Sequence, residues 1–418
     1  MLRLVYDELI VRFKPGVPPA RCRKIIEDSG FVQVQGNRFV ENQWIVRHSQ
    51  PGIAGQSLLA KIDAFKKYSE VLFAWPNSLA EYTRAAGVAT GPRRWWLDKI
   101  GVNWSTGKRR LTRGSCKVTV AVLDDGVDIV HPNLASRVPA NHGKDFTVAP
   151  NLPGHLDPVP KVRLTSNNPD SDYHGTLCAG LICSDGRRNK FLGVAPGCRL
   201  ISVRVLDGPN LINEGQTADA IRYATDVADV ISCSWWSIDY PAVALALDDT
   251  SKGRGGKGAA VFCSAGNQHN DAIVFPARHA PAIAVGACDR NGNRPAYSNT
   301  GAELAVVAPS SDELKLYVYS TDVSKKDWGF NPGTNTTGLF YKRFGKTSAA
   351  TAIAAGVGAL CFSVNPSLTA GALRNVLQKT AVKVGDPESY DPQTHHSLEF
   401  GYGCIDADAA VAKAKQTP

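Results

Sequence analysis

The sequence predicts an α/β protein in which a small α+β domain precedes a larger domain with a mostly parallel, doubly wound sheet and helices on both faces. Two observations predict this class. Apolar strand-like runs alternate with helical segments along most of the chain, whereas residues 1–80 follow the order βαββαβ. The length of 418 residues exceeds the roughly 250–300 residues at which one core stops growing, so two domains are expected.

Residues 1–80 are expected to form the small domain. ELIVRFK is strand-like, and PPARCRKIIEDSG is typical of a helix that begins at proline and ends at glycine. FVQVQG and QWIVRHS predict two strands, SLLAKIDAFKKYS an amphipathic helix and VLFAWP a last strand. This is the ferredoxin-like order. The polar stretch 81–94 is interpreted as a linker because it is rich in glycine and arginine.

The larger domain is expected over residues 95–418. Its apolar runs are, in order, KVTVAVLD, HGTLCAGLICSDG, RLISVRVL, TADAIRYATDVA, DVISCSWW, GAAVFCSAG, AIAVGAC and a helix from Ser348. Continuous apolar strands separated by helices are typical of a parallel sheet that is buried on both faces. Active sites of such sheets lie at the carboxyl ends of the strands, where Asp124, Trp235 and Asn267 fall.

Charge and composition exclude some partners. The formal net charge is +9, but the densest basic cluster, within 93–113, has no accompanying nucleic-acid motif and is interpreted as a solvated connector. The run 347–364 approaches the length of a membrane-spanning helix, yet its small and hydroxyl residues favour a helix buried among close neighbours. We therefore expect neither a nucleic acid nor a membrane as partner.

The cysteines predict free thiols. Several of the ten cysteines, among them Cys233, Cys263 and Cys361, lie in apolar segments, where a thiol packs as a small hydrophobe. No CxxC pair occurs, so zinc is not expected. The N-terminus has no secretory signal pattern. These features predict a cytoplasmic protein, or a secreted one if Met1 is not the native start.

Four polar residues supply the parts of nucleophilic catalysis. Asp124 and Asn267 end strands, and His174 and Ser348 open helices rich in small residues. A serine nucleophile needs a base, an acid that orients the base and donors for the oxyanion. An α/β-hydrolase would use the same triad, but the sequence has neither its GxSxG turn nor its order of serine, acid and histidine.

The order of these residues resembles that of the subtilisin-like serine proteases, the subtilases. VAVLDDGVD, HGTLCAG, SAGN and TSAATAIAAG carry the match, and LGVAP, FPARHAPAIAVGA, VVAPS and GYGCIDADAAV agree with it. The resemblance implies a subtilisin-like catalytic domain over 95–418, with Asp124, His174 and Ser348 as the triad. It also implies Asn267 and the backbone N–H of Ser348 as oxyanion donors.

The resemblance also implies partners. Residues 1–80 are similar to the propeptide of the family, which implies a zymogen whose own N-terminal domain is an intramolecular inhibitor. A peptide or protein substrate would add as a strand beside Ser234, Trp235 and Trp236. Trp236 stands where subtilases usually have glycine, so it either narrows the cleft or packs in the core.

The stretches DDG and SCSWW are kexin-like. In that branch the second acid helps to recognise a basic substrate side chain, which would be the role of Asp125. The alternative is that Asp125 hydrogen-bonds the turn before Gly126. Asp271 is a candidate for a second acid in such a pocket.

Three positions depart from the family pattern. Lys346 replaces a glycine and Ala352 a proline; a positive φ at Lys346 would cost about 1–2 kcal/mol. Asn133 replaces an aspartate that is a typical calcium ligand, and the loop 184–191 carries arginines, so a hard-cation site is weakened there. No catalytic cofactor is expected, and structural calcium stays an option. Asp170 and Asp172 would then belong either to a different calcium site or to a solvated acidic loop.

The leading hypothesis is a serine endopeptidase that is made as a zymogen. Two alternatives stay open. One is a catalytically silent binding or scaffold protein with the same fold, for which Trp236 and Lys346 would be signs of a blocked site. The other is a transpeptidase that uses the same acyl-enzyme to join peptides.

Overall fold

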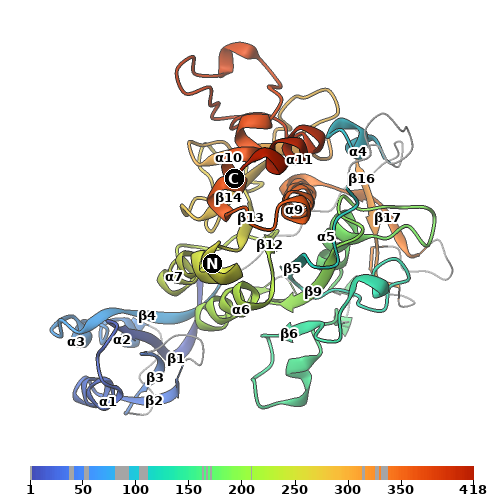
Figure 1. Cartoon of the computed structure of the whole chain (residues 1–418). Helices are drawn as coiled ribbons and strands as arrows, with labels where there is room; N and C mark the ends of the chain where they lie inside the picture. The colour runs from blue at the N-terminus through green and yellow to red at the C-terminus, as the bar shows by residue number, and fades with distance from the viewer. Residues whose placement is uncertain are drawn as a thin grey trace.

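The computed structural model describes residues 2–36, 42–50, 56–80, 94–102, 112–161, 164–165, 168–169, 172–208, 210–312, 316–324, 329–330 and 338–418. Within these residues the chain forms a four-stranded sheet, a seven-stranded sheet and three two-stranded ribbons (Figure 1). The predicted linker 81–94 lies outside the described residues except for Arg94.

The N-terminal sheet is antiparallel, with the strand order β2-β3-β1-β4. Its elements are β1 (Leu2–Phe13), α1 (Pro19–Asp28), β2 (Phe31–Gly36), β3 (Gln43–His48), α2 (Gln56–Leu59), α3 (Asp63–Lys66) and β4 (Val71–Ala80). The predicted order is observed, except that the second helix consists of two short pieces. Alternate residues of β1 face opposite sides: Leu9 and Val11 enter the core of this unit, whereas Ile10 enters the core of the larger sheet.

The larger sheet is parallel throughout, with the order β15-β14-β13-β12-β5-β9-β6. Its strands are β5 (Thr119–Asp124), β6 (Gly143–Asp145), β9 (Arg199–Arg204), β12 (Val230–Cys233), β13 (Ala260–Ser264), β14 (Ala282–Cys288) and β15 (Leu304–Pro309). The predicted α/β class is confirmed.

Helices cover both faces of this sheet. The helices are α4 (Trp95–Lys99), α5 (His174–Cys183), α6 (Glu214–Val227), α7 (Pro241–Asp249), α8 (Gly253–Gly256), α9 (Lys346–Val364), α10 (Ala370–Thr380) and α11 (Ala407–Gln416). Val120 and Val122 of β5 pack with α5 and α9, whereas Ala121 and Leu123 pack with α6 and α7. Because both faces are buried, the strands are apolar without alternation.

Short elements complete the chain. They are the ribbons β7 (Leu164–Thr165) with β8 (Asn168–Pro169), β10 (Leu206–Asp207) with β11 (Asn210–Leu211) and β16 (Val318–Thr321) with β17 (Phe340–Phe344), and the 3₁₀ turns Ala135–Arg137, Pro153–Leu156, Thr250–Lys252 and Pro387–Ser389. The ten cysteines are free thiols, and Cys233, Cys263 and Cys361 are buried as expected.

The chain changes direction across the sheet at β5. After β5 the chain adds β9 on one side of that strand and later adds β12 on its other side. Ligands bind at the carboxyl ends of strands at such a switch point. Asp124, the last residue of β5, therefore lies where a site is expected.

The helix α9 explains the apolar run 347–364. Among the described residues, this helix alone is long and apolar enough to cross a membrane, and 89% of its most apolar window is buried inside the protein. Its alanines and glycines allow close approach, since a Cβ on Gly356 or Gly358 would meet Val194 or Phe262 within 2.7 Å. The small residues thus serve packing against the sheet and α5.

The N-terminal sheet packs on the α6 face of the larger sheet (Figure 1). Ile10 of β1 is fully buried in the cluster that contains Ala218 and Ile221 of α6. The side chain of Ile10 approaches Gly215 so closely that an added Cβ there would lie 3.2 Å from it. The two sheets are therefore joined by an apolar contact through β1 and β4.

Candidate active site

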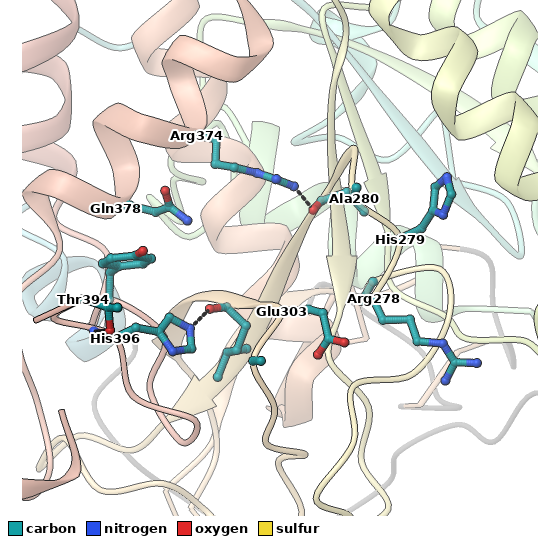
Figure 2. Close-up of a pocket in the computed structure, with 13 residues that line it drawn as sticks. Arg278, His279, Ala280, Glu303, Arg374, Gln378, Thr394 and His396 are labelled. Atoms are coloured by element: carbon teal, nitrogen blue, oxygen red, sulfur yellow. Dashed lines mark hydrogen bonds between the residues drawn. The ribbon is translucent and has the colours of Figure 1, made fainter. Parts of the chain in front are cut away.

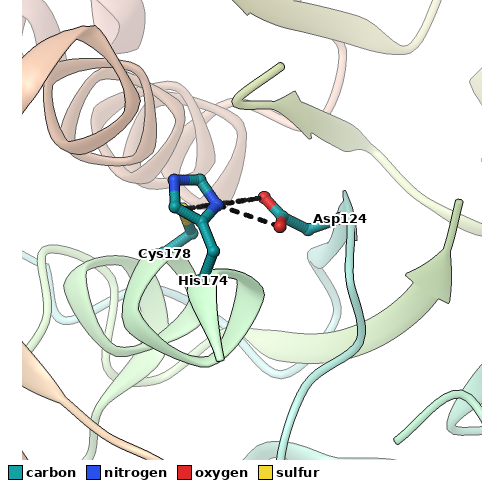
Figure 3. A group of neighbouring side chains, drawn as sticks. All are labelled: Asp124, His174 and Cys178. Carbon is teal, nitrogen blue, oxygen red and sulfur yellow. Dashed lines mark hydrogen bonds and ion pairs between the residues drawn. The ribbon is translucent and has the colours of Figure 1, made fainter. Parts of the chain in front are cut away.

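Asp124 and His174 form a buried pair at the carboxyl end of β5. Nδ1 of His174 lies 2.9 Å from both carboxylate oxygens of Asp124, and neither residue is exposed. Figure 3 shows the other ring nitrogen on the side away from Asp124. Since a carboxylate accepts, Nδ1 carries the proton and Nε2 is left as the basic nitrogen.

The neighbouring Asp125 caps helix α5. One of its oxygens accepts from the backbone N–H groups of Tyr173 and His174, both at 3.0 Å, and the other accepts from Gly175 at 2.8 Å. The side chain is fully buried. This carboxylate satisfies the free donors of a helix start. Because it is buried, it is not exposed to a substrate side chain, whereas a hydrogen bond to the turn before Gly126 stays a prediction.

Ser348 lies in the first turn of α9, which packs against α5. It is 2% exposed, and its Oγ donates to the carbonyl oxygen of Ser234 at 3.3 Å. Ser234 follows β12, and its own hydroxyl donates to the carbonyl oxygen of Ser348 at 3.1 Å. Ser234 is therefore held against the proposed nucleophile, at the edge where a substrate strand is expected.

The side-chain oxygen of Asn267 faces Thr347. It accepts from the backbone N–H of Thr347 at 3.0 Å and from its hydroxyl at 2.7 Å. Because the oxygen is held on this side, the amide NH₂ is directed away from Thr347 and is available as a donor. The orienting role of Thr347 was not predicted from the sequence, although its place directly before Ser348 is a signal.

Lys346 has the backbone conformation that favours glycine. Its φ is 58°, and its backbone is fixed by Ser310, whose hydroxyl donates to the Lys346 carbonyl at 2.6 Å, and by Ser311, which accepts from the Lys346 N–H at 3.1 Å. The loop before Ser348 therefore keeps its positive φ despite the lysine. Ala352 is buried inside a continuous helix, α9.

The two tryptophans do not form a cleft wall together. Trp235 is fully buried, and its Nε1 donates to the carbonyl oxygen of Leu123 at 2.9 Å. The ring of Trp235 therefore fills the core and does not line a cleft, while main-chain contact of this residue with a substrate strand stays a prediction. Trp236 is half-buried and packs against the cluster on the α6 face.

Asp271 is exposed and accepts from the hydroxyl of Thr300 at 3.3 Å.

Asp124, His174 and Cys178 also have the ligand types of a metal site. One ligand atom from each lies within 4.8 Å of the others (Figure 3). However, burial raises the pKa of the Cys178 thiol, and both carboxylate oxygens already engage Nδ1 of His174. A protonated thiol is a poor ligand. The cluster therefore fits an acid–base pair better than a metal.

The loop 184–191, where the sequence predicts a weakened hard-cation site, does not fit a cation. Nδ2 of Asn133 donates to the carbonyl oxygens of Arg188 and Phe191, both at 3.2 Å, and to Ser184 Oγ at 2.9 Å. Oxygens that a hard cation would need are thus taken by an amide. The alternative acid Asp172 binds Arg204 at 2.6 Å, and Asp170 lies outside the described residues.

A polar cavity of about 480 Å³ lies at the amino ends of β14 and β15. Arg374, Gln378, Glu303 and His396 are among the residues that line it (Figure 2). It borders Leu304, the first residue of β15, whereas Asp124 is the last residue of β5 and Asn267 follows the carboxyl end of β13. This cavity is therefore no part of the candidate active site.

Sequence reasoning missed a buried ion cluster beside Asp124. Arg204 ends β9 and contacts Asp145 and Asp172, and all three are fully buried. The signal was present in RLISVRVL, where an arginine interrupts an otherwise apolar strand end.

Comparison with known families gives one match over most of the chain. The model described as the subtilase family matches residues 115–403. The chain is 28% identical over 448 residues to a calcium-dependent protease of Trichormus variabilis, covering 98% of this chain and 64% of that protein. It is 31% identical over 318 residues to the human proprotein convertase subtilisin/kexin type 7, covering 71% of this chain and 38% of the convertase.

A solved structure gives the same fold. Fervidolysin from Fervidobacterium pennivorans, a keratinolytic enzyme related to subtilisin, has a TM-score of 0.74 and 21% identity, covering 99% of this chain and 61% of its own. The chain thus spans less than two thirds of the length of the calcium-dependent protease and of fervidolysin.

Proposed function

The chain belongs to the subtilase family, and we propose that it is a serine endopeptidase that cleaves peptide bonds with Asp124, His174 and Ser348. The observation that carries this proposal is the buried pair of Asp124 and His174, with Nδ1 at 2.9 Å from both carboxylate oxygens. The pair lies at the switch point of the sheet, and helix α5, which begins with His174, packs against helix α9, whose first turn contains Ser348.

Each side chain has one task in the proposed reaction. Ser348 Oγ attacks the scissile carbonyl while Nε2 of His174 takes its proton and then passes it to the leaving amine. Asp124 keeps the imidazole in the tautomer with the proton on Nδ1 and stabilises the imidazolium. Water then attacks the acyl-enzyme by the same route. The Ser348 hydroxyl donates to the Ser234 carbonyl oxygen. Hydrogen bonds between catalytic groups often tighten only when substrate binds.

The oxyanion has two proposed donors. The amide NH₂ of Asn267 is oriented by Thr347 through its side-chain oxygen. The backbone N–H of Ser348 lies at the positive end of the 19-residue helix α9. Loss of one such side-chain donor costs about 3–4 kcal/mol of transition-state stabilisation, a magnitude that comes from subtilisin itself.

Labelling by a fluorophosphonate probe tests this function. We expect covalent labelling of the wild-type chain, none of Ser348→Ala and strongly reduced labelling of His174→Ala, because the probe reports an activated serine. Absence of labelling in folded wild-type protein, after removal of the N-terminal domain, would favour a silent scaffold. Retention of the positive φ at Lys346 argues against a collapsed nucleophile loop.

We propose that residues 1–80 are an intramolecular inhibitor and that the protein is a zymogen. The apolar contact of Ile10 with α6 supports a docked N-terminal domain. Cleavage within 81–94 would release it. Mass spectrometry should show a shorter species for wild type than for Ser348→Ala; equal masses would contradict self-processing.

Peptides and proteins are the proposed substrates, and a basic preference now depends on Asp271. Asp125 is occupied by α5, whereas the carboxylate of Asp271 is exposed four residues after Asn267. Asp271→Asn should lower kcat/KM for arginine at P1 more than for leucine. An equal effect on both peptides would show that Asp271 does not belong to the specificity pocket.

Product masses with an added amine distinguish hydrolysis from transpeptidation.

A further inference from the structure

Arg204 lies between two acids in the middle of the sheet. It is the last residue of β9, and the strand register pairs it with Asp124 of β5 on one side and with Asp145 of β6 on the other. All three side chains are fully buried. Paired residues of parallel strands point to the same face, so a negative, a positive and a negative group form a row at the carboxyl edge.

The guanidinium of Arg204 bonds the chain on both sides of the acid–base pair. Its Nε donates to the carbonyl oxygen of Asp125 at 3.2 Å, directly after Asp124. Nε and Nη2 donate to Asp172 Oδ2 at 3.2 and 2.6 Å, two residues before His174. One rigid group thus links the segments that carry the acid and the base.

The rest of the cluster fixes Arg204 itself. Nη1 contacts both oxygens of Asp145, at 3.4 and 3.3 Å, and the hydroxyl of Thr147, while Nη2 also reaches Asp207 at 3.0 Å. Asp172 is held in turn by the backbone N–H of Gly208 at 3.2 Å and that of Lys161 at 3.1 Å. The planar fork of arginine matches this set of acceptors, whereas a lysine ammonium cannot reach them all.

Stability alone is a weak explanation for this cluster. The free-energy cost of desolvating buried ions often cancels their attraction. Well-packed apolar residues in the same place often stabilise a fold equally well or better. A buried ion cluster is more useful where it sets geometry, and this one bridges the two chain segments whose separation fixes the contact between Asp124 and His174.

We propose that Arg204 is a positioning residue for the Asp124–His174 pair. It acts through the Asp125 carbonyl and the Asp172 carboxylate and touches no substrate. This inference rests on the proposed function, in which that pair carries catalysis. It assigns a role to a residue outside the four subtilase motifs.

The test compares three variants in the full-length chain and in its matured form. Arg204→Met removes the hydrogen bonds of the guanidinium to all five partner residues. Arg204→Lys keeps the charge. Asp207→Asn is the matched control because it removes only the negative charge of the half-exposed acceptor of the same guanidinium. For Arg204→Met we expect kcat to fall by about tenfold to a hundredfold with KM changed less than about twofold, the size of effect that a misplaced catalytic group gives. Arg204→Lys should recover part of the loss, and Asp207→Asn should match wild type.

A proton spectrum separates positioning from overall destabilisation. In Ser348→Ala, the proton on Nδ1 of His174 should give a downfield resonance, because it is shared with a buried carboxylate. Adding Arg204→Met or Arg204→Lys should shift or broaden this resonance at a temperature where the protein is folded, whereas Asp207→Asn should not. An unchanged resonance with unchanged kcat in folded Arg204→Met would overturn the proposal.

Two further outcomes are distinguishable. If Arg204→Met does not fold, then Arg204→Lys and Asp172→Asn decide, and wild-type values for both would overturn the proposal. If wild type is not labelled by the fluorophosphonate, the proposed function fails. The resonance in Ser348→Ala still reports whether Arg204 positions the pair.

Discussion

Lys346 holds a left-handed backbone conformation, with φ at 58°, two residues before Ser348. The side chain makes this conformation cost about 1–2 kcal/mol, and Ser310 and Ser311 fix the backbone on both sides. Glycine removes the strain but adds about 0.4–1 kcal/mol of unfolded-state entropy. Lys346→Gly should therefore raise the free energy of unfolding by about 1 kcal/mol with kcat retained, as measured by denaturant titration.

The control for this prediction is Lys346→Ala. Alanine carries the same Cβ, so it should give no gain in stability. If both variants gain equally, the lysine ammonium and not the backbone strain is responsible.

Asn133 lies between β5 and β6, and its side-chain amide reaches into the loop between α5 and β9. Its NH₂ faces three oxygens, from Ser184, Arg188 and Phe191. Asn133→Asp would set a carboxylate against these oxygens, so stability should fall by about 1–3 kcal/mol in EDTA. Added calcium should restore much of the loss, because the site then has only hard oxygen ligands. Thermal unfolding with EDTA or calcium measures both effects.

A second variant identifies the cause. Asn133→Ala should lose stability without recovery by calcium. If Asn133→Asp behaves in the same way, no cation enters the loop.

At the residue scale the sequence predicts contacts only where a motif fixes the partner. The contact of Asp124 with His174 could be predicted because one residue ends a strand and the other begins a helix at the same edge. The contacts of Asp125 and Trp235 could not be predicted, because they depend on which segment of the chain lies beside each residue. Asp125 meets the start of α5, and Trp235 meets the carbonyl of Leu123.

At the element scale, α6 begins earlier than its apolar pattern indicates. The run TADAIRYATDVA predicts a start near Thr217, but the helix begins at Glu214 because Asn213 caps it. The Asn213 side-chain oxygen accepts from the backbone N–H of Gln216 at 3.0 Å, and the side-chain NH₂ of Asn213 donates to Oε1 of Gln216. The N-cap asparagine with glutamine three residues later is visible in NEGQ. Asparagine at such a start is a signal that hydrophobic spacing does not contain.

Glu214 in the first turn of α6 makes stability depend on pH. Burial raises its pKa to about 8 from 4.5, against a smaller lowering by the backbone N–H of Ala242. One oxygen accepts from that N–H at 2.6 Å, and the other has no hydrogen-bond partner in the described part of the chain. The folded state therefore holds a proton that the unfolded state has lost above pH 4.5.

The sign follows from this difference in bound protons. The stabilising effect is complete below about pH 4.5 and is lost as pH rises through about 8. In Glu214→Gln, whose amide resembles the protonated acid, the free energy of unfolding should fall less between pH 6 and pH 9, a range chosen to bracket that pKa. Denaturant titration at several pH values measures this. Glu303→Gln, which removes an exposed carboxylate, should keep the wild-type slope; parallel slopes for all three proteins would contradict the assignment.

At the scale of the whole molecule, local patterns do not reveal how the two sheets meet. The βαββαβ order and the alternation of β1 could be predicted, since Leu9, Val11 and Phe13 share one face. That Ile10 on the other face is buried by α6 could not, because both faces of β1 carry apolar residues. Contacts between units depend on partners far apart in sequence, which spacing within one strand cannot identify.

The same face of β1 brings Arg12 to α6. Arg12 lowers the pKa of Arg222 as one of the weaker causes, after burial, which is the main one. Among the described residues, Nε and Nη1 of Arg12 and both Nη atoms of Arg222 are buried without a hydrogen-bond partner. Unpaired buried donors and facing like charges oppose docking. The apolar contact of Ile10 with α6 therefore has to outweigh the free-energy cost of the buried polar groups of Arg12 and Arg222 beside it.

Replacing Arg12 by an apolar side chain of similar length should tighten the contact between the sheets. In Arg12→Met we expect docking to be favoured by about 1 kcal/mol or more, roughly fivefold. The reason is that two buried donors without a partner among the described residues, Nε and Nη1, are removed while the methylene packing is kept. The proposed zymogen should then activate more slowly, and in Ser348→Ala the amides of β1 and α6 should exchange hydrogen more slowly.

Arg12→Lys is the matched control, because it keeps the charge facing Arg222 and should behave like wild type in both measurements. Slower exchange in both variants would point to side-chain packing instead of charge. Faster exchange in Arg12→Met alone would mean that Arg12 supports docking through its exposed atoms. The apolar contact of Ile10 would then be insufficient to hold the N-terminal sheet on α6.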